Sequence, residues 1–490
     1  MMKKIETELA IVAAGPAGLC AAVAAAELGV EVAVFEKSGT IGGTANQGMG
    51  IFGVESRIQK NSMIPLTKED AFKRFMDYVH WQSDAQLVHD YFWKSGNTVD
   101  WLEDMGVRFA GAMRGFPDSE QTWHVVVPDG GGRPGPRAAS AMNRVIYERA
   151  LELGVQFYLN TPVSELIKKD GEIVGLRAVD DEGEEYEVSS IAVIVATGGF
   201  GTNPEMVKKY CNYDLHKDLF GFDIPGIVGD GHKMAWAAGA GKSRMEMERI
   251  MGSSIPGAFS GEYPGVRLFN QAGPIAVNKS GYRVCNEHVM QNFSVAGNII
   301  DFQQDRTVYM IIGESLVEYY RKNGLDYAGE VFHDDPTENF EARWEKVAER
   351  FPDAAFCAES VAELAEKLDV STKNLSKTIE RYNNYCARNH DDDFGKSYKF
   401  LHPIEGRLFA YRCAPGAYGS LGGIRINHRF EVLTDDYEII PGFYAAGSDV
   451  NTLYNGTYYF YFPGSTMGFA VNSGRMAGEY AANYILGNDA

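Results

Sequence analysis

The chain has 490 residues, of which 45% are hydrophobic and 23% charged, a composition typical of a globular protein with a large core. Its length allows roughly two or three domains, and its net charge of −20 argues against a nucleic acid or an anionic membrane surface as partner. The six cysteines are scattered singly, so neither disulfides nor a haem or iron–sulfur relay is indicated. No apolar run approaches a membrane span, and no metal-ligand spacing occurs. We expect no secretory signal before the first predicted strand and therefore a cytoplasmic protein.

The N-terminal stretch carries the clearest pattern. An apolar run at 9–13 predicts a buried parallel strand. The sequence AAGPAG at 13–18 predicts a tight turn, an alanine-rich helix follows to about Gly29, and a second apolar run at 30–35 predicts the next strand. A strand, a glycine turn, a helix and a strand in this order predict a βαβ unit that binds a dinucleotide.

Individual residues of this unit have expected roles. Gly15 lets the backbone approach a pyrophosphate, and the free N–H groups at the start of the helix favour an anion. Gly18 lets the helix lie close to the sheet, and Glu36, about 20 residues further on, can accept a hydrogen bond from a ribose hydroxyl. Ala13 stands where a first glycine is usual, and alanine can serve there if the turn needs no positive φ.

A glycine-rich loop at 42–53, with the sequence GGTANQGMGIFG, follows directly. Few side chains intrude there, so its backbone can run along a flat cofactor. Between 67 and 105 apolar and aromatic residues recur at helical spacing, which predicts helices that turn Phe72, Phe75 and Met76 toward the core.

Helices and strands alternate in the middle of the chain. A helix is predicted at 138–153, and short strands are predicted between 155 and 188, broken by two turn sequences. A buried strand at 191–196 then runs into Thr197-Gly198-Gly199. The sequence Gly-Asp-Gly at 229–231 begins a short amphipathic helix.

The composition changes at about Gly252, where charge, proline, tyrosine and helical runs increase until Phe400. We expect the first part of a nucleotide-binding domain at 1–250, an inserted cap domain at 251–400, and the return of the first domain at 401–490. In the returning part a final helix is predicted to begin near Thr466.

Several motifs occur in order along nearly the whole chain: GPAGLCAA, FEK, GGTANQGMG, VATGG, VGDGHKMA, SLGGI, GFYAAGSD and GSTMGFAVNSGRMAG. Together they resemble the superfamily of fumarate reductase and succinate dehydrogenase flavoprotein subunits, urocanate reductase and 3-ketosteroid dehydrogenases. The resemblance implies an α/β fold: a Rossmann-like FAD-binding domain with a β-hairpin layer and an inserted α+β cap. It also implies non-covalent FAD, with contacts at Gly15, Ala17, Gly18, Glu36, Lys37, Gly43, Thr44, Ala45, Gly48, Gly50, Val163, Ala196, Thr197, Gly198, Asp230, Gly447, Asp449, Thr466, Met467 and Gly468.

The cationic groups of the fumarate and urocanate reductases are missing. These enzymes use an arginine as proton donor, and Gln291 stands at the corresponding position in GYRVCNEHVMQN. A neutral amide cannot give a proton. The family histidines are missing from IMGSSIPG at 250–257 and from AYGSLGG, where Tyr418 and Gly419 stand, and the substrate-binding arginine is missing as well. Without these groups a small dicarboxylate would be held poorly.

The C-terminal motif is closer to that of the ketosteroid dehydrogenases, which use tyrosine hydroxyls instead. The resemblance implies Tyr461, just before the final loop, as a catalytic residue, together with Tyr418 and Tyr459; Tyr454 and Tyr458 belong to the same cluster. Hydride transfer at a C–C bond next to a carbonyl needs an acid or base at the neighbouring carbon and a donor to the enolate oxygen. A phenol suits an apolar pocket because its neutral form costs little to bury.

These patterns and the resemblance predict an FAD-dependent oxidoreductase that transfers hydride between flavin N5 and a C=C bond conjugated to a carbonyl, in a hydrophobic, cyclic enone. Because the chain has no relay, electrons would pass to or from an external partner such as NADH or a soluble carrier. One alternative is reduction of an unsaturated carboxylate, with charge from Arg267, Arg283 and Arg425. A flavin monooxygenase and a non-catalytic flavin-binding regulatory protein are the others.

Overall fold

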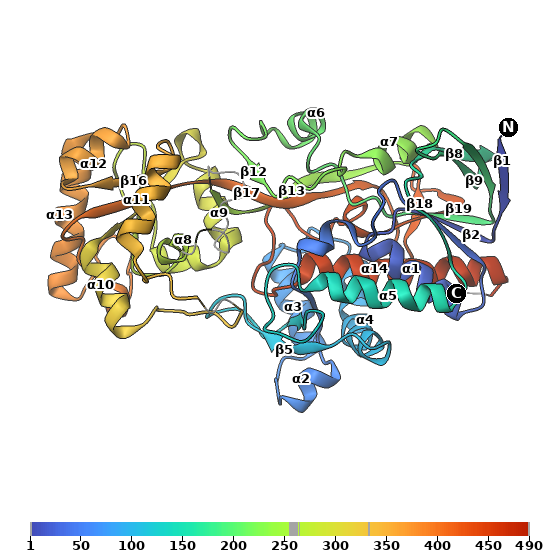
Figure 1. Cartoon of the computed structure of the whole chain (residues 1–490), viewed down its shortest axis with the longest axis horizontal. Helices are drawn as coiled ribbons and strands as arrows, with labels where there is room; N and C mark the ends of the chain where they lie inside the picture. Colours follow the sequence, from blue (N-terminus) through green and yellow to red (C-terminus); the bar gives the residue numbers. More distant parts are fainter. Residues whose placement is uncertain (1, 254–262, 264, 332–333, 489–490) are drawn as a thin grey trace.

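The computed structural model describes residues 2–253, 263, 265–331 and 334–488. The molecule is elongated, and its two lobes are joined by the long strands β13 (Lys242–Ser253) and β17 (Leu408–Ile424), which pair antiparallel (Figure 1). The N-terminal lobe, on the right of Figure 1, holds both chain ends.

The N-terminal lobe is built on a sheet of six strands in the order β18-β19-β11-β2-β3-β7. All neighbours in it are parallel except β18 and β19. The strands β2, β3 and β11 are runs of buried apolar residues, as expected for parallel strands covered on both faces. The bounds are β2 (Leu9–Val12), β3 (Val32–Phe35), β7 (Gln156–Tyr158), β11 (Ala192–Val195), β18 (Glu431–Leu433) and β19 (Ile439–Ala445).

Helices cover one face of this sheet and a hairpin layer covers the other. The helices α1 (Pro16–Glu27) and α14 (Ser465–Leu486) approach closely, because a Cβ on Gly474 would stand only 2.6 Å from Cα of Ala17. The helix α5 (Ala139–Glu152) lies beside α1 (Figure 1). The hairpin layer has the order β1-β10-β9-β8, and its β9 lies against β11 and β19. Its bounds are β1 (Lys3–Glu6), β8 (Val163–Lys169), β9 (Glu172–Val179) and β10 (Glu185–Ser189).

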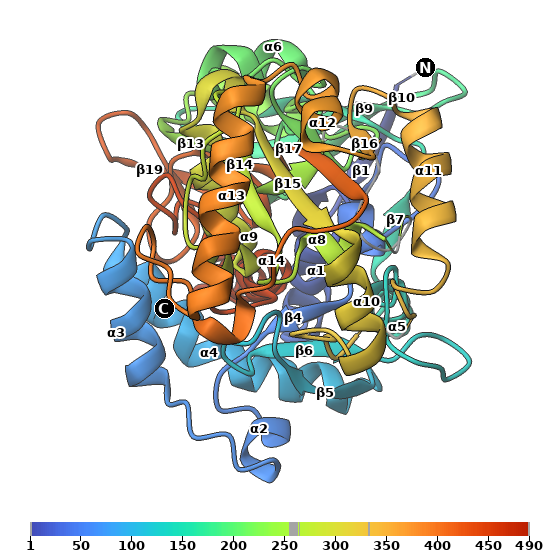
Figure 2. The same ribbon diagram turned by 90° about the vertical axis from the view of Figure 1, so that its left-hand side faces the viewer.

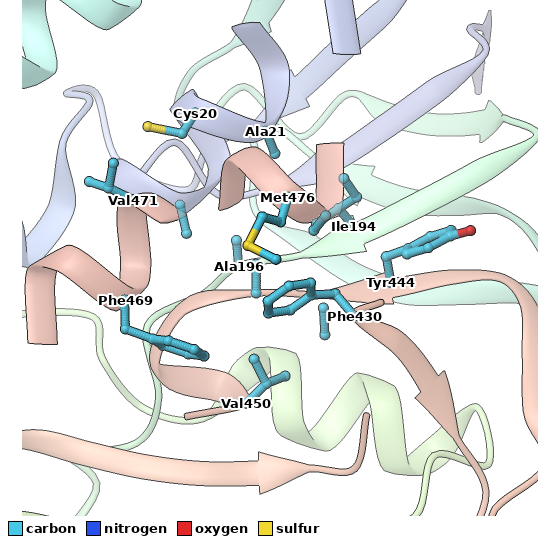
Figure 3. Packing of buried hydrophobic residues seen from close by; sticks show 14 of the residues in the cluster. Cys20, Ala21, Ile194, Ala196, Phe430, Tyr444, Val450, Phe469, Val471 and Met476 are labelled. Carbon is cyan, nitrogen blue, oxygen red and sulfur yellow. The ribbon is translucent and has the colours of Figure 1, made fainter. Parts of the chain in front are cut away.

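The core of this lobe lies between α1, α14 and the six-stranded sheet. In Figure 3, Cys20 of α1, Met476 of α14 and Ile194 of β11 belong to one buried cluster with Phe430 and Val450. Further elements of the lobe pack around this core. They are η1 (Gly43–Gln47), β4 (Gly50–Phe52), α2 (Arg57–Asn61), α3 (Lys68–Tyr78), α4 (Ala85–Asp104), β5 (Phe109–Met113), β6 (Trp123–Val126), α6 (Pro204–Met206), η2 (Val207–Cys211), α7 (Asp230–Ala237) and η6 (Gly447–Asp449).

The second lobe is an α+β unit around a sheet that begins with β12 (Phe220–Gly221) and has the order β12-β17-β15-β14. The strands β13 and β16 add to this sheet by pairing with β17. Figure 2 views this lobe end-on and shows α13 in front of the sheet and α11 at its side. The bounds are α8 (Val266–Phe269), β14 (Ile275–Asn278), η3 (Glu287–Gln291), α9 (Phe293–Asp301), η4 (Gln304–Arg306), β15 (Val308–Gly313), α10 (Glu314–Asn323), α11 (Phe340–Arg350), β16 (Ala355–Ala358), α12 (Val361–Lys367), α13 (Thr372–Arg388) and η5 (Tyr398–Phe400).

The predicted fold class is confirmed: a Rossmann-like sheet, a hairpin layer and a second α+β lobe are all present. The helical stretch predicted at 67–105 forms α3 and α4, and Phe75 and Met76 are buried as expected, whereas Phe72 is only partly buried. The domain boundaries stay a prediction, because residue 250 lies within β13, a strand shared by both lobes. None of the described helices combines the length and apolar character that a bilayer span requires.

Candidate active site

The carboxyl ends of the parallel strands define the candidate cofactor site. The strand β3 lies on one side of β2, whereas β11 and β19 lie on the other, so the strand order reverses between β2 and β11. Loops at such a reversal leave in opposite directions and open a crevice. The loops after β2, β3, β11 and β19 carry Gly15, Glu36, Thr197 and Gly447. The topology therefore gathers predicted contacts from distant parts of the chain at one edge of the sheet.

The turn after β2 differs from the expectation for Ala13. Its φ is +85°, a conformation that favours glycine, so the turn does need a positive φ and the alanine is strained. The turn brings the carbonyl group of Ala13 so close to Gly18 that a Cβ there would overlap it. Gly18 thus permits the close approach of α1 to this turn.

The start of α1 is open to an anion. Gly15 is the N-cap residue, no side chain caps the helix, and a Cβ on Gly15 would meet nothing within 4 Å. The first N–H groups and the positive end of the helix dipole therefore suit a phosphate. Gly43 faces this point, since a Cβ on it would lie 3.5 Å from Cα of Gly15.

Glu36 stands at the end of β3 with its carboxylate fixed by the backbone. Its Oε2 accepts a hydrogen bond from the N–H of Ala14 at 2.7 Å, and its Oε1 accepts one from Ser38 at 2.8 Å. A carboxylate has further lone pairs, so a ribose hydroxyl could also donate to it. The next residue, Lys37, forms a 2.7 Å ion pair with Asp230 at the start of α7. This pair places two further predicted contacts at the same end of the site.

Asp449 is fully buried behind the turn that follows β11. Its carboxylate accepts hydrogen bonds from the backbone N–H groups of Thr197 at 2.5 Å and Gly199 at 2.7 Å. The hydroxyl of Thr197 donates a third bond at 2.9 Å, and Nδ1 of His232 lies 3.5 Å away. Asp449 therefore holds the turn from β11, and its own contact with a cofactor stays a prediction.

Predicted contacts in the glycine loop meet those in α14. A Cβ on Gly48 would stand 3.1 Å from Sδ of Met467, and Gly468 leaves room for Phe52, whose N would lie 2.7 Å from a Cβ there. Gly50 instead faces β6 within the small sheet. The remaining predicted contacts lie in α1 (Ala17), η1 (Thr44, Ala45), at the start of β8 (Val163) and in the turn after β11 (Ala196, Gly198).

The N-terminus of α14 is a second helix end in this region. Its N-cap, Gly464, has a φ of +88°, and a Cβ on it would stand 2.7 Å from backbone atoms of Ile51 and Phe52. No side chain caps the helix, so its first N–H groups suit a partial negative charge. The resemblance places the pyrimidine edge of a flavin at this helix start.

The tyrosines divide into two groups. The rings of Tyr418, on β17, and Tyr458 meet edge to face with centres 6.2 Å apart, and Tyr454 packs edge to face on Tyr458 at 4.9 Å. Tyr459 packs on Phe75 and Tyr78 of α3, whereas the ring of Tyr461 lies nearer to that of Phe116, at 5.4 Å, than to that of Tyr78, at 6.4 Å. The structure therefore groups the predicted catalytic residue Tyr418 with Tyr458, apart from Tyr459 and Tyr461.

Sequence reasoning missed an acidic residue beside the first group. Glu248 of β13 is 1% exposed, and a hydrogen bond joins its Oε1 to the hydroxyl of Thr466 in α14. The pairing of β13 with β17 slips here, so that Glu248 alone opposes Tyr418 and Gly419 at a β-bulge. The sequence contained one indication of this residue, a glutamate next to the alternating methionines of β13. The direction of its side chain follows only from the bulge.

Burial raises the pKa of the Glu248 carboxyl well above its ordinary value, which favours the protonated form. Burial and the nearby Glu248 also raise the pKa of the Tyr418 and Tyr458 phenols. For Tyr458, the nearby polar groups of Thr466 oppose this rise in pKa. Within the described ranges no lysine or arginine is paired with Glu248.

An aromatic stack borders the site from the second lobe. The ring of Phe460 is stacked between those of Phe116, at 5.8 Å, and Phe293 of α9, at 5.6 Å. Gln291, two residues before Phe293, is buried, and its Oε1 has no hydrogen-bond partner among the described residues. Apolar rings and a neutral amide are therefore what this side offers a substrate.

The arginines suggested for a carboxylate substrate have other partners. Arg283 forms a buried ion pair with Glu287 at 2.8 Å, and Arg267 pairs with Asp334 at 3.0 Å. Arg425 donates to backbone carbonyl oxygens near the surface. Residues 254–257, part of the stretch that lacks the family histidine, lie outside the described residues.

The residues at this edge fit FAD. The open start of α1 suits its pyrophosphate, Glu36 suits its ribose, and the uncapped start of α14 suits the charge that a reduced flavin carries. In the part of the chain that the structure describes, no group of three or more histidine, cysteine or acidic side chains is placed to hold a metal ion.

The family model of the FAD binding domain matches residues 8–460. The chain belongs to this family. Vinyl phenol reductase of Lactiplantibacillus plantarum is 30% identical over 487 residues, which cover 97% of this chain and 96% of that protein. The predictions of this superfamily, of FAD and of an oxidoreductase are confirmed.

Two further comparisons extend the likeness. NADH:fumarate oxidoreductase of Klebsiella pneumoniae is 30% identical over 491 residues, covering 98% of this chain but 48% of that protein, so the chain spans about half of this relative. The crystal structure of 3-ketosteroid-delta4-(5alpha)-dehydrogenase from Rhodococcus jostii RHA1 has a TM-score of 0.73 at 23% identity, covering 98% of this chain and 97% of that one. That structure shows the shared fold.

Proposed function

We propose that this FAD-binding protein reduces a C=C bond in an uncharged, apolar substrate whose alkene is conjugated to a ketone or a phenol. The observation that carries the proposal is the group formed by Glu248, Thr466, Tyr458 and Tyr418 at the start of α14. It offers neutral hydrogen-bond donors where a carboxylate substrate would need cations. The similarity to vinyl phenol reductase along nearly the full length of both chains supports this substrate class.

The chain's own residues would move the proton. When bound, FAD supplies hydride chemistry at its N5 atom. Tyr458 is the candidate acid, because its phenol lies across from that of Tyr418, near Thr466 at the start of α14. Tyr418, across from it, would donate to the oxygen on which negative charge develops. Tyr459 and Tyr461 remain candidates from the resemblance.

The aromatic stack indicates where the substrate would lie. Phe116 belongs to the N-terminal lobe, Phe293 to the second lobe, and Phe460 lies between them. Flat aromatic or alicyclic rings pack well against such side chains. We therefore place the substrate between the lobes and propose that residues 251–400 act as its cap.

FAD is proposed to bind without a covalent link. The loop at 42–53 has no histidine, cysteine or tyrosine that could form one. Acid precipitation should therefore release the flavin into the supernatant, and flavin that stays in the protein pellet would contradict the proposal. Electrons would come from an external donor such as NADH or a soluble carrier, and NADH is in the name of the Klebsiella pneumoniae relative.

Product analysis tests the proposed reaction. The FAD-loaded protein is incubated without oxygen with reduced methyl viologen and 4-vinylphenol, a cyclic enone or fumarate. Mass spectrometry should show the gain of two hydrogens in 4-vinylphenol or the enone. Reduction of fumarate alone would favour a carboxylate-directed reductase instead.

A further inference from the structure

We propose that Arg249 of β13 is a positioning residue, which couples the second lobe to the segment 456–466 and thereby keeps Tyr458 in place for proton transfer. The inference rests on the proposed function, because it takes Tyr458 as the acid. It adds the reason why an irregular segment can hold an acid at a fixed place. Arg249 would act through this segment, so it need not touch the substrate.

The segment that carries Tyr458 has to be held by side chains from outside. Between Asp449 and Ser465 the chain forms neither a helix nor a strand, so no backbone ladder fixes it. Proton transfer depends on distance and direction, and a displacement of about 1 Å can cost about 100-fold in rate. The contacts at the ends of the segment therefore decide where the phenol lies.

Neighbouring residues of β13 bind both ends of this segment. At its start, Oε2 of Glu246 accepts a hydrogen bond from the N–H of Gly456 at 2.8 Å, and Nη2 of Arg249 donates to the carbonyl oxygen of Gly456 at 2.7 Å. At its end, the hydroxyl of Thr466 donates to Oε1 of Glu248. One strand therefore sets the positions of both ends.

Arg249 also binds the helix α9 of the second lobe. Its Nε and Nη2 donate to Oδ1 of Asn298 at 3.0 and 2.8 Å, and its Nη1 donates to Oδ2 of Asp301 at 3.1 Å. The other N–H of Nη1 donates to the hydroxyl of Tyr213 at 2.7 Å. With the bond to Gly456, all five N–H groups of the guanidinium have an acceptor. The side chain is thus fixed in one orientation between the segment and α9.

A second link joins the same helix to the same segment. Nδ2 of Asn298 donates to Oγ1 of Thr457 at 2.6 Å, and this hydroxyl lies 3.0 Å from the phenol oxygen of Tyr78 in α3. The phenol of Tyr78 donates in turn to the carbonyl oxygen of Tyr458 at 3.4 Å. A displacement of α9 would therefore be passed to the backbone of Tyr458.

The variant Arg249→Met removes the link and should still fold. Asp301 keeps Arg306 as a partner at 3.2 Å, so its carboxylate is not left without a cation. The FAD-loaded variant should keep its flavin and its circular dichroism spectrum. Its steady-state reduction of 4-vinylphenol with reduced methyl viologen should fall about 30-fold, because the phenol of Tyr458 is no longer held in place.

A double variant separates positioning from a general structural role. In Tyr458→Phe the acid is gone, so Arg249 has nothing left to position. The double variant Arg249→Met/Tyr458→Phe should therefore be as slow as Tyr458→Phe alone. If Arg249 acted independently of Tyr458, the double variant would be slowed by the product of the two single effects, and that result would overturn the inference.

Arg306→Met is the matched control. Arg306 also binds Asp301, and its side chain is 24% exposed against 21% for Arg249. Within the described ranges its partners lie outside the segment 456–466, so turnover should stay within about twofold of the wild type. A loss as large as that of Arg249→Met would mean that any cation on α9 matters, and it would contradict the proposed link.

The second link has its own pair of variants. Thr457→Val removes the hydroxyl that α9 binds and should lower turnover about fivefold, whereas Thr457→Ser keeps the hydroxyl and should retain most of the activity. Equal rates for the two variants would exclude this hydroxyl as part of the coupling.

Hydrogen exchange tests the link without any substrate. Mass spectrometry of peptides that cover residues 456–462 should show faster amide exchange in Arg249→Met than in the wild type, and no change in Arg306→Met. Unchanged exchange in Arg249→Met would overturn the inference. If fumarate proves to be the substrate, the proposed function fails, and the exchange rates still decide whether Arg249 holds the segment.

Discussion

The carboxyl group of Glu248 is hydrogen-bonded to the hydroxyl of Thr466, the second residue of α14. The first belongs to a strand that joins the two lobes, and the second to the helix whose start suits a flavin. The bulge that sets Glu248 against Tyr418 brings this acid among phenols. The result is a site of neutral hydrogen-bond donors beside the cofactor edge.

Replacing Tyr458 by phenylalanine tests the proposed acid. Tyr458→Phe should bind FAD normally and turn over about 100-fold more slowly, because the hydroxyl that gives the proton is lost. Tyr461→Phe should stay within about threefold of the wild type, since its ring packs on Phe116, Tyr459 and Tyr78 and, among the described residues, on neither Tyr418 nor Tyr458. Rates of reduction of 4-vinylphenol at equal flavin content give the comparison. The opposite ranking would return the catalytic role to Tyr461.

Replacing Gly15 by valine should remove FAD without unfolding the protein. A Cβ on Gly15 meets no protein atom within 4 Å and its backbone is extended, so valine fits the fold but fills the space in front of α1. After gel filtration the variant should be colourless, with a wild-type circular dichroism spectrum. Yellow protein at full flavin content would exclude this helix start as the pyrophosphate site.

Replacing Ala13 by glycine should stabilise the protein. The φ of +85° strains alanine, and relief of that strain exceeds the entropy that glycine adds to the unfolded chain, for a net gain of about 0.5–1 kcal/mol. Urea denaturation with excess FAD measures the change. The neighbouring Ala14→Gly is the control and should lower stability, because no positive φ compensates there. A loss of stability in Ala13→Gly would show that the turn does not strain residue 13.

His124 should make stability depend on pH. It is fully buried, its Nε2 lies 2.7 Å from Oγ of Ser56, and burial lowers its pKa to about 4. The unfolded chain binds this proton near pH 6.5, so the folded state loses stability as pH falls from about 6.5 to about 4, by about 1.4 kcal/mol per unit. Between pH 7 and pH 5 the free energy of unfolding should therefore fall less in His124→Gln than in the wild type. An equal fall would rule out His124 as the cause.

The parts of this structure that depend on short-range sequence patterns were predictable from the sequence. The βαβ unit, the hairpin layer and the start of α14 follow from strand alternation, helical spacing and glycine turns. The strain at Ala13 was not predictable, because its φ depends on how closely α1 packs against the turn. The division between Tyr458 and Tyr459 depends on the irregular path of their segment, and Glu248 required the bulge between β13 and β17. Contacts between distant segments decide each of these features.

Anaerobic reoxidation of the reduced flavin tests the central claim most directly. The purified protein is photoreduced and mixed in separate runs with 4-vinylphenol, a cyclic enone and fumarate, while the absorbance of oxidised flavin is recorded. We predict that 4-vinylphenol or the enone restores this absorbance and that fumarate does not. Reoxidation by fumarate alone would contradict the proposed substrate class. The carboxylates of fumarate would then have to be bound by a cationic side chain that lies outside the group around Glu248.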